Sequence, residues 1–392
     1  MFKKKIVLMI FLWLLCQKIS YCQPEPTNTL ISVITCSPGN DIYTVYGHTA
    51  IRLRDTFNKE DIVFNYGTFD FQTDGFIYKF LKGRLPYYLA AGHFDRFLES
   101  YKQEGRSVTE QVITLNDSQK AHLINALWVN AAPENREYMY DFFFDNCSTR
   151  VRDILGQVIK TNWGESVSSN KTFRDLIKEF QVQSPWTDFG IDLIIGAKAD
   201  IVASRKEACF LPNYFMDEID RQSPLILQEK TMLTPASPVQ LNKSFTSFFL
   251  SPMGVFSILL LLEFFFIFQL MNAKLSKWSK IYDTAWVVIL LIAFIIMAFM
   301  WFGTDHKATK DNWNILWVVL PLPILLFKKF TKSIYFISVG ILGCLVLNIA
   351  FQLLIIPQKF HIALSLVLLI LIVKITRGYL EGSKINFNSI LP

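Results

Sequence analysis

The residue best placed for chemistry is Cys147, in the segment DNCSTRVRDILGQVIK. Apolar residues recur at helical spacing through this segment, which predicts a helix from about Asp145 to Lys160. Asp145 or Asn146 is a good N-cap, and either one places Cys147 in the first helical turn. The unpaired N–H groups and the positive end of the helix dipole there favour a thiolate over a thiol. Cys147 is therefore a candidate nucleophile; a buried structural cysteine or half of a disulfide is the alternative.

A cysteine nucleophile needs a base, and three histidines precede the long apolar runs: His48, His93 and His122. His122 lies in a polar helical segment, and His93 lies in a loop or at a helix start. His48 follows Gly47 in a predicted strand, with the small Ala50 on the same side, which leaves room for a substrate. We therefore place His48 first, with a purely structural histidine as the alternative.

The sequence lacks the common motifs that bind metals, nucleotides and dinucleotide cofactors. The sequence has no CxxC pair, no Walker loop and no GxGxxG, so we expect no metal, no cofactor and no nucleotide. Six cysteines are too few for a disulfide scaffold. The sequence does not decide whether Cys36 and Cys209 form a disulfide.

Composition points to a membrane protein. The chain has 392 residues, of which 52% are hydrophobic and 18% charged, against about 25% charged in soluble domains. The net charge of +6 is spread between apolar runs, so we expect no nucleic-acid partner. Three lysines before a short apolar run predict a signal peptide over residues 1–22, which places the following residues outside the cytoplasm.

Five apolar spans follow a mixed region, at roughly 249–271, 285–303, 313–327, 333–356 and 360–375. Lys and Arg are concentrated in the loops after the first and third spans and in the C-terminal tail. By the positive-inside rule, these loops and the C-terminus are cytoplasmic, so residues 23–245 face outward.

The expected fold class is α+β followed by a transmembrane bundle. Strands are predicted over 42–54 and 61–69, joined by a polar turn, and a helix over Asp117–Val129. The predicted division is a signal peptide (1–22), an outer domain (23–227), a linker (228–247), five spans (248–378) and a cytoplasmic tail (379–392).

Four segments together resemble the Lnb family, the lipoprotein N-acyltransferases of Bacteroidota. They are TCSPGNDIYTVYGHTAIRL, FNYGTFDF, ENREYMYDFFFDNCSTRVRDIL and KADIVASRKEACFLPNYFMDEID, and the likeness covers most of residues 30–222. The stretch FGTDHKATKDNWNILW extends it into the membrane half. The resemblance implies a permuted papain-like outer domain of the NlpC and lecithin:retinol acyltransferase kind, in which the histidine strand precedes the cysteine helix.

The resemblance also implies roles for residues at the site. Cys147 matches the nucleophile and His48 the general base. Asn65, on the adjacent strand, is the candidate that orients the imidazole; Tyr46 and Tyr66 compete for that role and are candidate substrate contacts. The oxyanion hole would combine the Cys147 N–H with the side chain of Asn146.

The implied reaction moves an acyl chain from a membrane phospholipid, through a Cys147 thioester, to the α-amino group of a diacylglyceryl lipoprotein. The location would be the bacterial inner membrane, with the catalytic domain in the periplasm. Glu263 is a candidate site residue because an intramembrane charge is costly. Further candidates for contacting lipid head groups or the lipoprotein are Asp305, His306, Asn312, Asn314 and Arg150; an ordinary solvated loop is the alternative for the first four.

Two other function classes remain at this point. A membrane-anchored NlpC-type cysteine peptidase would use the same Cys147–His48 pair on peptidoglycan. A non-catalytic membrane receptor or assembly factor would leave Cys147 as a structural residue.

Overall fold

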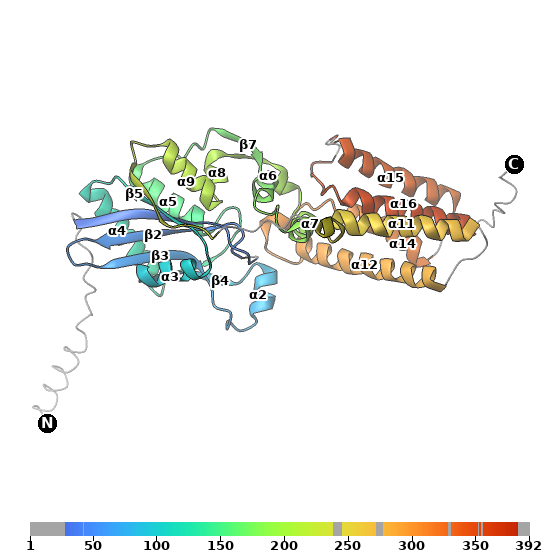
Figure 1. The fold of residues 1–392 in the computed structure, drawn as a ribbon, viewed down its shortest axis with the longest axis horizontal. Coiled ribbons are helices and arrows are strands. Elements are labelled where there is room, and N and C mark those ends of the chain that lie inside the picture. Colours follow the sequence, from blue (N-terminus) through green and yellow to red (C-terminus); the bar gives the residue numbers. More distant parts are fainter. Residues whose placement is uncertain are drawn as a thin grey trace, which may run out of the picture.

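The computed structural model describes residues 28–237 except 42, then 245–271, 277–327, 331–351, 353 and 356–382. The signal peptide predicted over 1–22 lies outside these residues. Figure 1 shows a sheet-rich N-terminal domain, referred to below as the outer domain, joined end to end with a C-terminal helical region.

The outer domain is built on a seven-stranded sheet with the order β6-β4-β3-β2-β1-β5-β9, in which all neighbours are antiparallel. The strands are β1 (Thr29–Cys36), β2 (His48–Asp55), β3 (Asp61–Thr68), β4 (Pro86–His93), β5 (Val108–Ile113), β6 (Glu137–Met139) and β9 (Leu227–Thr234). The predicted pairing of the strands at 42–54 and 61–69 is confirmed, since β2 pairs with β3. β2 begins only at His48, because the preceding residues form a turn closed by a bond from the Gly47 N–H to the Thr44 carbonyl.

Helices cover both faces of this sheet. One core cluster packs α4 (Asp117–Ala131), α5 (Cys147–Ile159) and α9 (Pro212–Arg221) against one face, which includes Val33. The next residue, Ile34, points to the other face and packs in a second cluster with α3 (Phe94–Gln103). The predicted helices over 117–129 and 145–160 correspond to α4 and α5.

A small subdomain lies between the sheet and the helical region (Figure 1). It contains the strand pair β7 (Ser168–Thr172) and β8 (Val202–Ser204) with α6 (Phe173–Lys178), α7 (Pro185–Ile194), the short 3-10 helix η2 (Ala197–Asp200) and α8 (Arg205–Ala208). Its own core is rich in aromatic residues, among them Phe143, Phe173 and Phe210.

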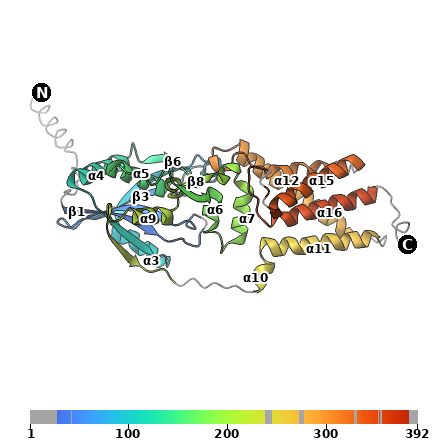
Figure 2. The same ribbon diagram turned by 90° about the horizontal axis from the view of Figure 1, so that it is seen from above.

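The helical region contains α10 (Phe245–Phe249), α11 (Pro252–Met271), α12 (Lys277–Phe302), α13 (Ile315–Val319), α14 (Pro321–Phe327), α15 (Lys332–Phe351) and α16 (Leu364–Gly382). Figures 1 and 2 show the long helices running side by side. Among the described residues, α11, α12 and α15 are long and apolar enough to cross a membrane. The predicted span at 313–327 is two short helices that meet at Pro321, and the one at 360–375 falls in α16, which carries Lys374 and Arg377.

Part of the predicted linker belongs to the outer domain instead. Residues 227–234 form β9, whose Glu229 pairs with Val112 of β5 at the edge of the sheet. Residues 238–244 of that linker lie outside the described residues.

Candidate active site

Cys147 is the first residue of α5, and the cap of that helix sets its position. The Asn146 side-chain oxygen accepts hydrogen bonds from the N–H groups of Ser148 and Thr149, both at 2.9 Å. The Thr149 hydroxyl accepts from the Asn146 N–H at 2.7 Å, which completes a capping box. The Asn146 amide nitrogen donates to two backbone carbonyls, at 2.9 and 2.8 Å. The Asn146 side-chain amide, which was expected to donate to an oxyanion, therefore already donates to two backbone carbonyls at the start of α5.

His48 is the first residue of β2, and its ring is held by Asn65 on the neighbouring strand β3. The distance from His48 Nε2 to Asn65 Oδ1 is 2.5 Å. An amide oxygen only accepts, so the imidazole donates from Nε2. The neutral ring then carries its lone pair on Nδ1, which is the atom free to take a proton.

Two glycines let the strands approach the cysteine. Gly47 has φ +84°, and a Cβ there would lie 2.8 Å from the Cys36 carbonyl oxygen, so a side chain does not fit before His48. Gly67 has φ +87°, and a Cβ there would lie 3.5 Å from Cys147 Cβ. The end of β3 therefore passes directly beside the cysteine.

Cys147 and His48 line one cavity of about 320 Å³, within the usual size range of small-molecule sites. The Thr49 N–H group, next to His48, acts on the Cys147 thiol by lowering its pKa. His93 and His122 are not among the residues that line this cavity. Its remaining wall is mostly aromatic and apolar, with Tyr43, Tyr46, Phe69, Phe80, Leu85, Tyr87, Tyr140, Phe142, Phe210 and Pro212.

Burial controls the protonation of the pair. Burial raises the pKa of the Cys147 thiol, although the N–H groups of Thr49, Ser148 and Cys147 itself act in the opposite direction. Burial also lowers the pKa of His48 to about 4, against the opposing effect of the Asn65 bond. The helix N-terminus was expected to favour the thiolate, but desolvation outweighs it. At pH 7 the site therefore holds a neutral thiol and a neutral imidazole.

The helical region contributes to the same cavity. His306, in the loop that follows α12, lies on the cavity wall and donates from Nε2 to the Phe80 carbonyl at 3.1 Å. Its neighbour Asp305 pairs with Arg84 at 2.5 Å, and the Asp305 N–H donates to the Lys82 carbonyl at 2.8 Å. The loop is thus attached to α2 (Phe76–Lys82) of the outer domain and its C-terminal end.

Comparison with known families covers both parts of the chain. A family model described as the Lnb N-terminal periplasmic domain matches residues 23–179. A second, described as the Lnb transmembrane domain, matches residues 243–384. This chain belongs to the Lnb family. No curated protein and no solved structure was found to match it.

Three other residues predicted at the site of this Lnb-family chain lie in different surroundings. Tyr46 lines the cavity, and its hydroxyl accepts from Gln181 Nε2 at 2.6 Å. Tyr66 is buried in the sheet core, where its hydroxyl accepts from Asn130. Arg150 forms two bonds to Asp145, at 2.6 and 2.8 Å, so its charge is already paired. Only Tyr46 of these three lines the cavity.

Asn312 and Asn314 do not face the cavity. Both are buried, and the Asn312 amide donates to the carbonyls of Leu193 and Ile194 at 2.8 and 2.9 Å. Asn314 donates to the Asp192 carbonyl at 2.9 Å. The two amides therefore pair with the last carbonyls of α7 and join the outer domain to the helical region.

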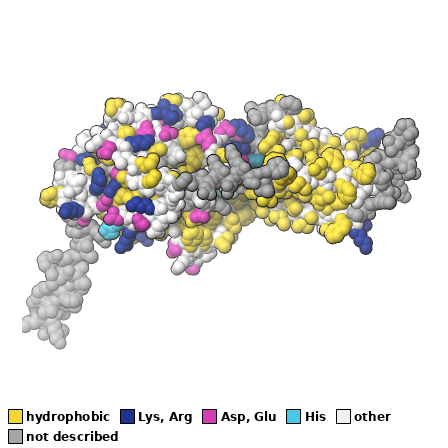
Figure 3. All heavy atoms as spheres, in the orientation of Figure 1, with side chains coloured by type: hydrophobic (Ala, Val, Ile, Leu, Met, Phe, Trp, Pro, Cys, Tyr) yellow, Lys and Arg dark blue, Asp and Glu magenta, His cyan; other side chains and the backbone are white. Residues whose placement is uncertain are grey.

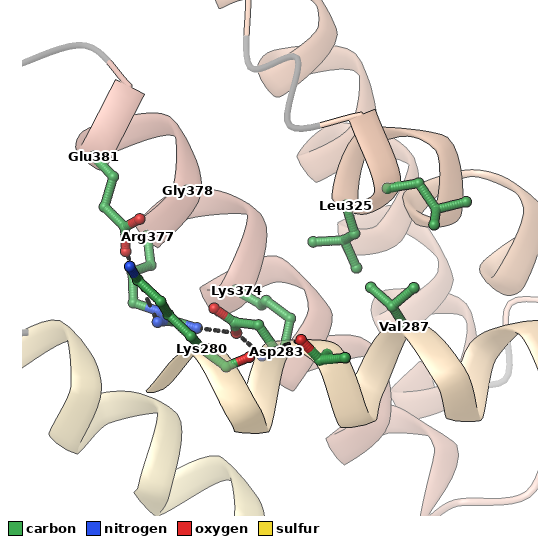
Figure 4. Close-up of a pocket in the computed structure, with 10 residues that line it drawn as sticks. Lys280, Asp283, Val287, Leu325, Lys374, Arg377, Gly378 and Glu381 are labelled. Carbon is green, nitrogen blue, oxygen red and sulfur yellow. Dashed lines mark hydrogen bonds and ion pairs between the residues drawn. The ribbon is translucent and has the colours of Figure 1, made fainter. Parts of the chain in front are cut away.

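Glu263 is part of a buried ion-pair network within the helical region. It pairs with Lys374 and Arg377 of α16, and both cations also pair with Asp283 of α12. Figure 4 shows Lys374 and Arg377 directed toward Asp283, at the wall of a separate pocket of about 460 Å³. The ion pairs between helices explain why a charged residue is buried at position 263. Glu263 does not line the Cys147 cavity.

One group of described residues has spacing that could suit a metal: Asp188, Asp192 and His361. His361 Nε2 lies 3.1 Å from Asp188 Oδ2. Asp192 pairs with Arg174 and Lys178, both at 2.7 Å. Asp192 is already paired with two cations, and the bond between Asp188 and His361 is another contact between α7 and the loop before α16.

The sequence did not predict the aromatic wall of the Cys147 cavity or the part of that wall that α2 supplies. The run Phe142–Phe144 and the aromatic residues between Phe69 and Phe80 are the signal that was present. Phe69, Phe80 and Phe142 come from separate loops and helices, so the spacing of these residues does not reveal that the three meet around one cysteine.

Proposed function

We propose that this Lnb-family chain is a lipoprotein N-acyltransferase. It moves an acyl chain from a membrane phospholipid to the α-amino group of a diacylglyceryl-cysteine at a lipoprotein N-terminus. The observation that best supports this proposal is the shared cavity. Cys147 and His48 line a mostly apolar, aromatic space, and His306 from the membrane half forms part of its wall. An acyl chain fits such a wall, and both substrates are anchored in the membrane.

In the first half-reaction, His48 Nδ1 takes the thiol proton while the Cys147 sulfur attacks the ester carbonyl of the phospholipid. The resting neutral pair requires this concerted transfer, since no thiolate is stored in advance. The tetrahedral intermediate collapses to a thioester, and the imidazolium returns its proton to the departing lysophospholipid oxygen. The Cys147 N–H, at the start of α5, is the oxyanion donor, because the Asn146 amide and the N–H groups of Ser148 and Thr149 are already bonded.

In the second half-reaction, the lipoprotein amine attacks the thioester and gives its proton to His48. An amide forms, and the Cys147 sulfur leaves and regains the proton from the imidazolium. The apolar wall keeps water away from the thioester, so that aminolysis outcompetes hydrolysis. Asn65 keeps the same ring nitrogen available in both half-reactions.

The fold proposed with this function is a permuted papain-like outer domain, in which the His48 strand precedes the Cys147 helix. In the membrane, α13 with α14 and α16 complete a five-helix bundle with the three long apolar helices. The signal peptide and the loop charges support a location in the bacterial inner membrane, with the outer domain in the periplasm and the C-terminus in the cytoplasm.

His306 and Tyr46 are the remaining candidates for contacting substrate. Both line the cavity and carry polar atoms on a wall that is mostly aromatic and apolar. They could orient a head group or the acceptor amine beside the thioester.

The test is intact-protein mass spectrometry after detergent-purified protein is incubated with phospholipid. We expect a mass increase of one acyl chain in the wild type and none in Cys147→Ala. Cys344→Ala is the matched control, because it removes an exposed thiol outside the cavity and should be acylated normally. A wild type that stays unmodified while it cleaves peptidoglycan peptides would replace this proposal with the peptidase.

A further inference from the structure

The short helix α2 presents an apolar surface that the described protein leaves uncovered. None of its residues is buried, and the exposed fraction is 73% for Ile77, 64% for Tyr78 and 43% for Leu81. Single exposed apolar residues are ordinary, but a group of them on two turns marks an interaction surface.

The position of α2 identifies what covers that surface. Its end is bonded to the loop at the outer end of α12 through Lys82, Arg84 and Phe80, whose partners are Asp305 and His306. Phe302, the last residue of the apolar helix α12, is 73% exposed beside that loop. Figure 1 places α2 at the end of the outer domain that faces the helical region, and Figure 3 shows hydrophobic side chains continuing from that region onto the outer domain.

We propose that α2 is an interfacial helix that lies in the outer leaflet of the membrane and guides the lipid acyl chain into the Cys147 cavity. The occupant of its exposed surface is therefore bilayer phospholipid. Lys79 and Lys82 in its last turn supply positive charge for lipid phosphates. The role in guiding the acyl chain rests on the proposed acyltransferase function; the membrane contact does not.

A second surface of the same helix faces the reaction site. Phe80 lines the cavity together with Phe69, and Phe76 packs against both, with ring centroids at 6.2 and 6.0 Å. Ile77 and Leu81, one turn apart, lie on the neighbouring exposed face. An acyl chain that leaves the bilayer along α2 therefore reaches the aromatic wall beside Cys147.

Gly83 allows the close contact between α2 and the membrane loop. It has φ +72°, and a Cβ there would lie 3.2 Å from the His306 ring. The left-handed turn ends α2 and brings its last carbonyls to the loop after α12. This attachment fixes the height of α2 relative to the end of the spanning helix.

The membrane contact is tested by photo-crosslinking in lipid nanodiscs, with a benzophenone amino acid at position 77. Position 302, at the end of α12, is the positive control, and position 57, which is 76% exposed in the distant β2–β3 turn, is the negative control. We expect phospholipid adducts at 77 and 302 and none at 57. Adducts at 302 without any at 77 would overturn the proposal.

The role in substrate delivery is tested by the rate of Cys147 acylation. Ile77→Glu should slow acylation from bilayer phospholipid by about tenfold, because a charge opposes insertion into the leaflet. Acylation from a monomeric short-chain phospholipid should change by no more than about twofold, as expected of a surface substitution. Phe57→Glu, the matched control, should affect neither donor.

The outcomes separate the two proposals. Equal slowing with both donors would show that Ile77 acts on the chemistry and not on delivery, and would overturn the inference. If the wild type were acylated by neither donor, the proposed function would fail, while the crosslinking result would still decide whether α2 contacts the membrane.

Discussion

The bond between His48 and Asn65 gives the most specific prediction about the chemistry. Asn65→Ala removes the acceptor for Nε2–H, at 2.5 Å, and leaves a partly buried donor unpaired. The imidazole then loses its preference for the tautomer with Nδ1 free. Loss of one such bond with an unsatisfied donor costs about 2 kcal/mol, which corresponds to a decrease of about thirtyfold in acylation rate.

The assay is the single-turnover rate of Cys147 acylation, followed by intact mass. Tyr66→Phe is the matched control, because Tyr66 lies on the same strand as Asn65 and the change removes only its bond from Asn130 of α4. Its rate should stay near that of the wild type. Similar losses in Asn65→Ala and Tyr66→Phe would mean that the strand was disturbed, and would refute the orienting role.

Asn65→Asp refines the same test through pH dependence. It keeps an acceptor for Nε2–H but adds a negative charge beside the ring, which favours the imidazolium and raises the pKa of His48 from about 4. The acidic limb of the acylation rate should therefore move to higher pH. An unchanged profile would contradict the contact.

Further predictions follow from burial and pairing. Because the pKa of His48 is lowered to about 4, the base stays unprotonated at mildly acidic pH, so acylation should hold steady from pH 8 to about 6, where an ordinary histidine would already lose activity. Iodoacetamide should alkylate Cys147 at pH 7 more slowly than free cysteine, because burial raises its pKa. Glu263→Gln should lower the free energy of unfolding in detergent by about 1–3 kcal/mol, because Lys374 and Arg377 lose one buried charged partner but keep Asp283; thermal unfolding measures this. Asn312→Ala should cost about 2 kcal/mol in the same assay through two lost bonds to α7.

Local signals predicted how the central residues of the candidate site are placed. The cap at Asn146 and the apolar periodicity after it are encoded within a few residues, so α5 and the position of Cys147 could be read directly. His48 and Asn65 lie on two strands joined by a short turn, and their contact follows from that local hairpin.

Long-range contacts account for what the sequence did not predict. β9 joins the sheet beside β5, more than a hundred residues earlier in the chain, so residues 228–234 resemble a linker until that pairing is known. Asn312 and Asn314 are polar residues at the start of a predicted span, and only the docking of α7 reveals that they are buried. The protonation state of Cys147 likewise depends on burial by distant aromatic residues, which a helix-end argument does not include.

The most direct measurement is the fate of the isolated acyl-enzyme. Acylated protein is freed of phospholipid and mixed with a diacylglyceryl lipopeptide that has either a free or an acetylated α-amino group. We expect the peptide with the free amine to remove the acyl chain from Cys147 and to gain an equal mass as an amide, while the acetylated peptide does not. Loss of the acyl chain to water at the same rate with both peptides would contradict it and indicate a lipid hydrolase.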